Sequence, residues 1–164
     1  MTFHVELETM DLLCLDYRKI LEQVAMKILD MEQCPYEVEV NLILTGNNEI
    51  RELNQTYRFI DKETDVLSFP MIEFQKPSDF SNLEKGVGCF HPESGELLLG
   101  DIVLSLPKVA EQSEKFGHGI LREFSFLIAH SMLHLLGYDH MRQEDADLME
   151  KKQNLILDEL QIFR

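Results

Sequence analysis

The stretch HSMLHLLGYDH holds the residues best suited to chemistry, namely His130, His134 and His140. The first two are four residues apart, so on a helix they share one face. Gly137 stands where a helix commonly ends in a left-handed turn, which would bring His140 back to the same point. Three converging imidazole nitrogens form the ligand set of a catalytic zinc ion, which keeps a fourth position open for water. The spacing therefore predicts a metal site with hydrolytic chemistry.

A structural role for these histidines is the alternative, because one histidine on an apolar helix is more often a hydrogen-bonded core residue than a ligand. The third histidine favours metal binding, since HxxxHxxGxxH reproduces the ligand spacing HExxHxxGxxH of the metzincin peptidases. Those enzymes use the glutamate as a general base, and this chain has Ser131 in its place. A serine hydroxyl is a much weaker base, so peptide hydrolysis by that route is disfavoured. Three neutral imidazoles would accept zinc, nickel or copper.

The elements that must position these residues alternate between strand and helix. Alternating or continuous apolar residues predict strands over 3–7, 37–44, 64–69 and 96–105, the last interrupted at Gly100. Helical spacing predicts helices over 11–32, 47–57, 107–116, 120–136 and 142–161. Residues 71–95 are polar and rich in Pro, Ser and Gly, which is typical of a long surface loop. The expected fold is α/β: a mixed sheet of about four strands flanked by about five helices, with the metal site on the largely buried helix 120–136.

Length and composition favour an ordinary globular protein. A chain of 164 residues fits one domain, so we expect residues 1–164 to form a single metal-dependent hydrolase domain. No apolar run approaches the ~20 residues of a membrane span, and no secretory signal is visible at the N-terminus. The odd number of cysteines, Cys14, Cys34 and Cys89, argues against a disulfide framework and favours the cytoplasm. Cys14 is expected in the core.

The formal net charge of −15 opposes the simplest form of nucleic-acid binding, in which lysine and arginine neutralise phosphates. A polyanionic substrate would therefore need a local basic pocket on a surface that otherwise repels it. The alternative is that the negative net charge only favours solubility and has no role in binding.

Three blocks of this sequence resemble one family. HSMLHLLGYDH resembles the HGxLHLxGYDH signature of the YbeY family, the bacterial metal-dependent endoribonucleases of ribosomal RNA maturation. LNQTYRFIDKETDVLSFP (53–70) resembles that family's LNxxYRxxDxxTDVLSFP block, and GDIVLS (100–105) resembles its GDIxIS strand. With the flanking EQSEKFGHGILREFSFLIAH, the resemblance covers most of residues 50–145. Ser131 departs from the usual Gly and would place a hydroxyl beside the first ligand, where it could alter how closely a substrate approaches.

The resemblance implies that His130, His134 and His140 bind one divalent ion, with zinc expected and nickel the other candidate. It also implies that Arg58 is the functional basic residue. In that mechanism, water on the ion attacks a phosphodiester while the paired donors of Arg58 stabilise the phosphate. The implied substrate is single-stranded RNA, and the implied partner is the ribosome or its small-subunit RNA, in ribosomal RNA maturation and ribosome quality control.

Three alternatives stay open. Arg58 could be a surface ion-pair partner of Asp61 or Glu63, the chain could be a metzincin-like zinc peptidase, or it could be a non-catalytic metal-containing ribosome assembly factor. Glu123 is expected to have a structural role, such as an ion pair with Arg122. Asp101 and Asp139 are weaker candidates for orienting a ligand ring, and Thr64 and Asp65 for holding the Arg58 loop through local hydrogen bonds. His118 is expected to be a loop or cap residue, with lining of the cleft as the alternative.

Overall fold

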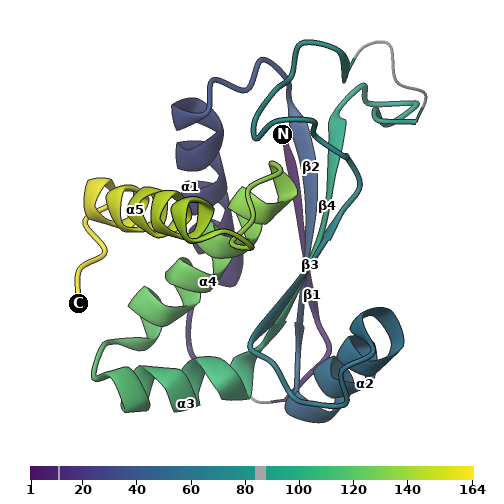
Figure 1. The fold of residues 1–164 in the computed structure, drawn as a ribbon. Coiled ribbons are helices and arrows are strands. Elements are labelled where there is room, and N and C mark those ends of the chain that lie inside the picture. The colour runs from purple at the N-terminus through teal and green to yellow at the C-terminus, as the bar shows by residue number, and fades with distance from the viewer. Residues whose placement is uncertain (11, 84–87) are drawn as a thin grey trace.

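A four-stranded sheet forms the centre of the structure, a computed structural model that describes residues 1–10, 12–83 and 88–164. The strands are β1 (Thr2–Leu7), β2 (Val38–Thr45), β3 (Val66–Pro70) and β4 (Leu97–Ser105). Their order in the sheet is β1-β2-β4-β3 (Figure 1). β2 is parallel to β1 and β4, whereas β3 is antiparallel to β4. The predicted mixed sheet of about four strands is therefore confirmed.

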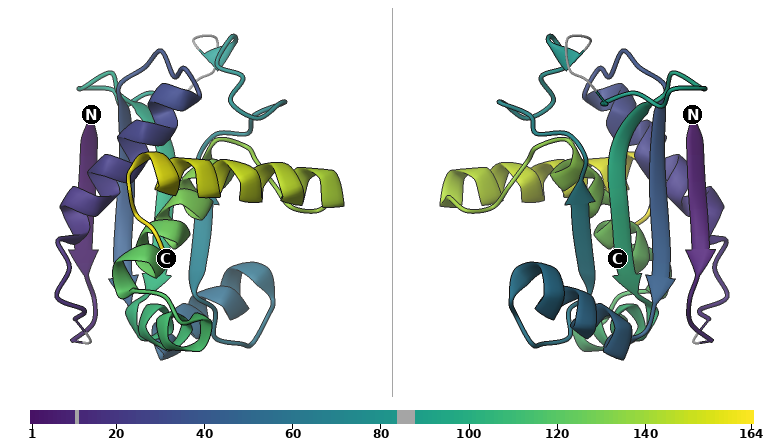
Figure 2. Two further views of the ribbon diagram at one scale, coloured as in Figure 1. Left: turned by 90° about the vertical axis from the view of Figure 1, so that its left-hand side faces the viewer. Right: turned by 90° about the vertical axis from the view of Figure 1, so that its right-hand side faces the viewer.

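Five helices flank this sheet, as predicted. They are α1 (Tyr17–Met31), α2 (Asn47–Arg58), α3 (Leu106–Phe116), α4 (Ile120–Leu135) and α5 (Gln143–Glu159). Figures 1 and 2 show α1, α3, α4 and α5 on one side of the sheet and α2 on the other. A small apolar cluster of Ile50, Leu67 and Val103 packs on the α2 side. No helix in the described part of the chain is long and apolar enough to span a membrane.

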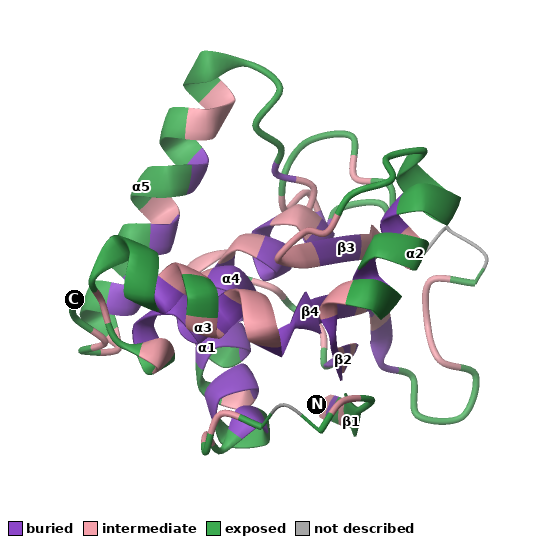
Figure 3. Cartoon of the chain, turned by 90° about the horizontal axis from the view of Figure 1, so that it is seen from below, coloured by how far each residue is buried: buried purple, intermediate pink, exposed green. Residues whose placement is uncertain are grey.

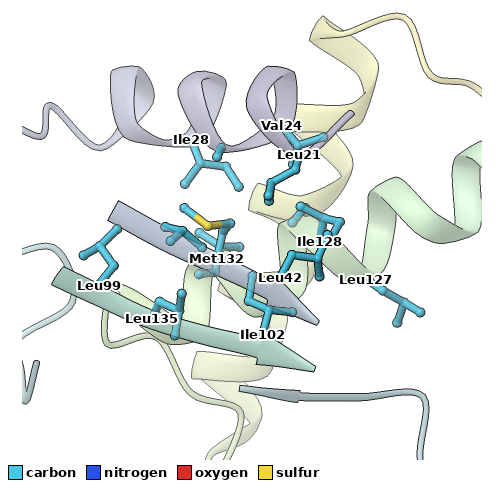
Figure 4. Close-up of a cluster of buried hydrophobic side chains, with 14 of the residues drawn as sticks. Leu21, Val24, Ile28, Leu42, Leu99, Ile102, Leu127, Ile128, Met132 and Leu135 are labelled. Carbon is cyan, nitrogen blue, oxygen red and sulfur yellow. The ribbon is translucent and has the colours of Figure 1, made fainter. Parts of the chain in front are cut away.

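Helix α4 is buried on nearly all of its surface because it contacts α1, α3 and α5 as well as β3 and β4. Figure 3 shows this burial beside the mostly exposed α5. An apolar helix of this kind cannot be stable at the surface, so the packing agrees with its composition. The close-up in Figure 4 shows its side chains Leu127, Ile128, Met132 and Leu135 meeting those of α1 and of strands β2 and β4. The core thus holds the helix that carries His130 and His134.

Helix α1 begins later than the sequence predicts. It starts at Tyr17, because the Asp16 side chain caps it by accepting a hydrogen bond from the backbone N–H of Lys19 at 3.2 Å. Of the preceding segment predicted as helical, residue 11 lies outside the described residues, and residues 12–16 are not helical. Cys14 has a φ of 54° and is exposed, so its predicted place in the core is wrong.

The segment 71–95 is irregular, as predicted, but it is not simply a surface loop. Residues 84–87 of this prediction lie outside the described residues. Ile72 and Phe80 are 6% and 9% exposed and belong to the core cluster. Phe80 also packs edge-on against Phe74, with ring centroids 5.6 Å apart. These apolar residues have no helical or strand period, which is why the sequence pattern did not identify them as core.

Strand β4 continues through Gly100 as one strand, with a register shift against β2 between Leu98 and Gly100. Gly100 has a φ of +139°, and a Cβ atom there would lie 2.2 Å from the backbone oxygen of Phe69 on the neighbouring β3. Only glycine tolerates both this backbone conformation and this close approach. Gly100 therefore permits the tight pairing of β3 with β4, which places β3 beside the histidines of α4.

We expect Gly100→Ala to lower the free energy of unfolding by more than about 2 kcal/mol, because the new methyl group would clash with backbone. Urea unfolding followed by circular dichroism would measure the loss. Gly119→Ala is the control, since a Cβ there meets nothing within 4 Å, and its cost should stay below about 1 kcal/mol. Equal stability of the two variants would contradict this reading of β4.

Candidate metal centre

The structure brings His130, His134 and His140 together, as their spacing predicts. One nitrogen from each ring can be chosen such that all three lie within 4.8 Å of one another. The Nε2 atoms of His130 and His134 are 3.1 Å apart, and the ring of His140 lies with its centroid 5.1 Å from that of His134. His130 and His134 are partly buried and His140 is exposed. The cluster could therefore hold a metal ion with one side open.

The turn after α4 delivers His140 to the cluster. Gly137 has a φ of +92°, and the backbone N–H of Tyr138 donates to the carbonyl of Leu133 at 3.0 Å. A Cβ atom at Gly137 would lie 2.8 Å from the Cβ of Phe74. The predicted left-handed turn is confirmed, and its close contact with the 71–83 segment adds a second reason for glycine.

The tautomer of His134 is set by the backbone. Its Nδ1 lies 2.8 Å from the carbonyl oxygen of Tyr138. A carbonyl only accepts hydrogen bonds, so Nδ1 carries the hydrogen and Nε2 presents a lone pair to the cluster. This is the state that a metal ligand requires.

The histidines are also held neutral. Burial and, to a smaller extent, the neighbouring rings of His134 and His140 together lower the pKa of His130 from 6.5 to about 4. Burial lowers the pKa of His134 as well, against the opposing effect of its bond to Tyr138. Metals bind the neutral imidazole, so this state of His130 and His134 suits a divalent transition metal, for which the His140 ring offers a third nitrogen.

A buried carboxylate anchors the turn from behind. Glu32, whose side chain is 7% exposed, accepts hydrogen bonds from Tyr138 Oη at 2.6 Å, Ser78 Oγ at 2.7 Å and Lys152 Nζ at 2.5 Å. Burial alone would raise the pKa of this carboxyl, but the three donors outweigh it and hold the pKa below its usual value. The end of α1, the 71–83 segment, the His140 turn and α5 are thereby tied together.

A cleft of about 770 Å³ opens beside the histidines. Its walls come from β3, from residues 71–74 and from the turn that contains Gly137 and His140, and Arg58 lines it as well. The sequence analysis did not identify residues 71–74 as part of the site. The apolar residues Met71 and Ile72, which follow β3 directly, were the sequence feature that could have indicated that this segment continues along the site.

Arg58 lies on the cleft wall at the end of α2. Its Nη2 donates to the carbonyl of Ser68 at 2.9 Å. Asp61 instead pairs with Arg51 at 2.7 Å. Glu63 pairs with Lys108 at 3.2 Å. Within the described ranges no carboxylate lies within 4.0 Å of Arg58, so the alternative of a surface ion pair with Asp61 or Glu63 is wrong. The other guanidinium donors of Arg58, which lines the cleft, have no carboxylate partner in the described part of the chain.

Two secondary expectations need correction. Glu123 pairs with His118, whose side chain is 8% exposed, and not with Arg122. Asp101 accepts a hydrogen bond from Asn41 at 2.7 Å and lines a separate hollow. It therefore does not orient a ligand ring. Strand alternation explains this, because side chains at successive positions point to opposite faces of the sheet.

The other secondary candidates lie near the cleft. Thr64, Asp65 and Asp139 line it. Asp65 accepts hydrogen bonds from the backbone N–H of Val66 at 2.8 Å and from Gln112 at 3.1 Å, which fixes the start of β3. Asp139 accepts from the backbone N–H of Met141 at 3.1 Å.

Ser131 does not face the substrate side of the site. It is 0% exposed, and its hydroxyl is buried without a hydrogen-bond partner among the described residues. Each residue of a helix is rotated by roughly 100° from the one before, so Ser131 points into the core while His130 points to the cleft. The expected effect of this hydroxyl on substrate approach is therefore wrong.

Three converging neutral imidazoles beside an unpaired arginine, in an open cleft of an α/β fold, are typical of metal-dependent hydrolases. The family model described as "Endoribonuclease YbeY" matches residues 4–161. The chain belongs to the YbeY family.

Individual relatives agree with this assignment. A protein of Lachnoclostridium phytofermentans is 52% identical over 165 residues, and one of Agathobacter rectalis is 50% identical, each match covering all of both chains. A protein of Lachnospira eligens is 48% identical over the whole of both chains. All three are named "Endoribonuclease YbeY". The solution structure of TM1509 from Thermotoga maritima is 26% identical with a TM-score of 0.56, covering 97% of this chain and 91% of that one.

The stability of the metal-free protein should fall as the pH is lowered from about 6.5 towards 4. In this window the unfolded chain protonates His130, whereas the folded chain, with its pKa of about 4, does not. The unfolded state then binds more protons, so the free energy of unfolding decreases as the pH falls. Urea unfolding in the presence of a chelator, at intervals between pH 4.5 and 7, measures this.

His130→Gln should flatten this pH dependence, and His4→Gln should not, because the His4 side chain is 61% exposed. A free energy of unfolding that stays constant or increases on acidification would contradict the burial of neutral imidazoles.

Proposed function

We propose that this chain is a metal-dependent endoribonuclease that cuts single-stranded RNA. His130, His134 and His140 hold one divalent ion, and Arg58 binds the phosphodiester. One observation carries the proposal: the three-histidine cluster and an arginine without a carboxylate partner line the same cleft. The relatives named as endoribonucleases supply the class of substrate.

A divalent ion held there would neutralise charge on a phosphate oxygen and make a water molecule more acidic. The chain's own residues would orient the metal ligands and bind the phosphate. The Tyr138 carbonyl keeps the Nε2 lone pair of His134 directed at the cluster. Nη2 of Arg58 donates one hydrogen bond to the carbonyl of Ser68. The other N–H groups of its guanidinium can form paired hydrogen bonds to a phosphate. A bound divalent ion and Arg58 would thus supply positive charge for a phosphate in a cleft that Asp65, Glu73 and Asp139 also line, on a chain with a net charge of −15.

The peptidase alternative has no support in this geometry. The position of the metzincin base is occupied by Ser131, which is fully buried. Its hydroxyl cannot reach a peptide in the cleft, and among the described residues the three-histidine cluster contains no carboxylate, although Asp65, Glu73 and Asp139 line the wider cleft.

The resemblance to the family supports the proposed identity of the metal ion, the location of the protein and the choice of RNA. Zinc is the expected ion, with nickel as the other candidate, because three neutral imidazoles suit both. Residues 1–164 act as one hydrolase domain in the cytoplasm. The RNA is that of the small ribosomal subunit, bound alone or within the ribosome, and the reaction serves its maturation and quality control.

The decisive test compares substrates. Protein purified without a nickel resin would be analysed for bound metal, then incubated with labelled single-stranded RNA, duplex RNA and unfolded casein. We expect internal cleavage of the single-stranded RNA, abolished by a chelator and restored by zinc. Cleavage of casein without cleavage of RNA would support the peptidase instead. Normal ribosomal RNA processing in cells that carry a folded His130→Ala variant would support the non-catalytic assembly factor.

Arg58→Ala should reduce the cleavage rate about 10²–10³-fold, because the phosphate loses its charged donors in the transition state. Arg58→Lys should recover only part of the rate, since an ammonium lacks the paired donors. Single-turnover cleavage measures both, and zinc affinity should stay unchanged. Arg51→Ala is the matched control on the same helix, because Arg51 pairs with Asp61 at the surface. An Arg58→Ala enzyme as active as Arg51→Ala would refute the assigned role.

A further inference from the structure

Gln153 of α5 reaches the back of the candidate metal centre. Its side chain is one of the few buried polar groups of that helix, with the residue 3% exposed. The amide Nε2 lies 2.5 Å from Nδ1 of His130, the ring nitrogen opposite the one that faces His134. A buried amide at this distance is a specific contact and not a chance neighbour.

His130 and His134 differ in what holds their outer nitrogens. Nδ1 of His134 faces a backbone carbonyl, which accepts only and allows one tautomer. Nδ1 of His130 faces a primary amide, which has a donating NH₂ and an accepting oxygen in one planar group. A half-turn of the amide exchanges the two, so the same side chain can donate to Nδ1 or accept from it. His130 is thus the ligand whose tautomer is not set by the backbone.

The amide has two orientations with different consequences. When its NH₂ donates to Nδ1, the hydrogen of His130 lies on Nε2 and is directed at Nε2 of His134, 3.1 Å away. The two rings then hydrogen bond to each other. When the amide oxygen accepts from Nδ1, the Nε2 of His130 presents a lone pair. Two lone pairs facing each other at this distance repel, unless a cation lies between them.

We propose that Gln153 is a positioning residue that matches the tautomer of His130 to the state of the metal centre. Its amide donates to Nδ1 when the two histidines bond to each other, and accepts from Nδ1 when His130 binds a divalent cation. The inference rests on the proposed metal site and adds a residue to it. A glutamate at this position could only accept, so it would favour the metal-binding tautomer at all times. Glutamine instead stabilises both states.

The test measures zinc affinity and the histidine tautomer. Zinc dissociation constants would be obtained by competition with a chromophoric chelator. Gln153→Leu should bind zinc about 10–100-fold more weakly, because the ligand ring loses its outer partner. Gln153→Glu should bind more tightly than the wild type. Gln143→Leu, at an exposed glutamine of the same helix that bonds to Asp147, should bind like the wild type.

Nitrogen-15 NMR of the histidine rings provides the second readout. In the metal-free wild type His130 should carry its hydrogen on Nε2, and zinc should move it to Nδ1. In metal-free Gln153→Glu the hydrogen should already lie on Nδ1. Urea unfolding of the metal-free variants would show that each is folded, and the nearly isosteric Gln153→Glu keeps the test valid should the leucine variant unfold.

Two results would overturn the role of Gln153 while leaving the metal centre intact. The first is equal zinc affinity of the wild type and of a folded Gln153→Leu variant, with both proteins binding zinc. The other is a metal-free wild type with the His130 hydrogen on Nδ1. A wild type that binds no divalent ion would instead overturn the proposed metal centre, and the inference with it.

Discussion

The burial of α4 is the constraint on which the candidate site depends. This helix packs against the sheet and three other helices, and Figure 4 shows its apolar side chains within the core. His130 and His134, one turn apart on this helix, therefore have little freedom to move apart. The same burial removes water from the rings and lowers the pKa of both histidines. One packing arrangement therefore supplies both the geometry and the charge state that a metal ligand needs.

The outer parts of the site are held by contacts between distant segments. Glu32 lies at the end of α1, yet it binds Tyr138 of the His140 turn and Lys152 of α5, residues 106 and 120 positions away. Lys152 and Gln153 are adjacent on α5, and they reach the turn and the back of His130 respectively. Helix α5 is mostly exposed (Figure 3). Its buried apolar residues Met149, Ile156 and Leu157 pack inward, and its one buried polar residue, Gln153, contacts His130.

Charge is distributed so that the cleft differs from the rest of the surface. The chain has twice as many acidic as basic residues, 30 against 15, which disfavours binding of nucleic acid over the whole surface. Among the described residues no carboxylate lies within 4.0 Å of Arg58 on the cleft wall, because Arg51 and Lys108 bind Asp61 and Glu63. Asp65, Glu73 and Asp139 also line the cleft, so the attraction of a phosphate to it would depend on Arg58 together with a bound divalent ion.

The sequence by itself determined the secondary structure around the site and the meeting of the three histidines. Strand alternation, helical spacing and the glycine turn after α4 are local features, since each depends on residues a few positions apart. The tertiary structure alone decided which polar groups serve the site. In the folded chain Asp61 and Glu63 pair with Arg51 and Lys108, and Asp101 lies in a separate hollow. Ile72 and Phe80 are buried in the core, and Gln153 contacts His130. These outcomes depend on contacts between segments far apart in the chain, which no local pattern encodes.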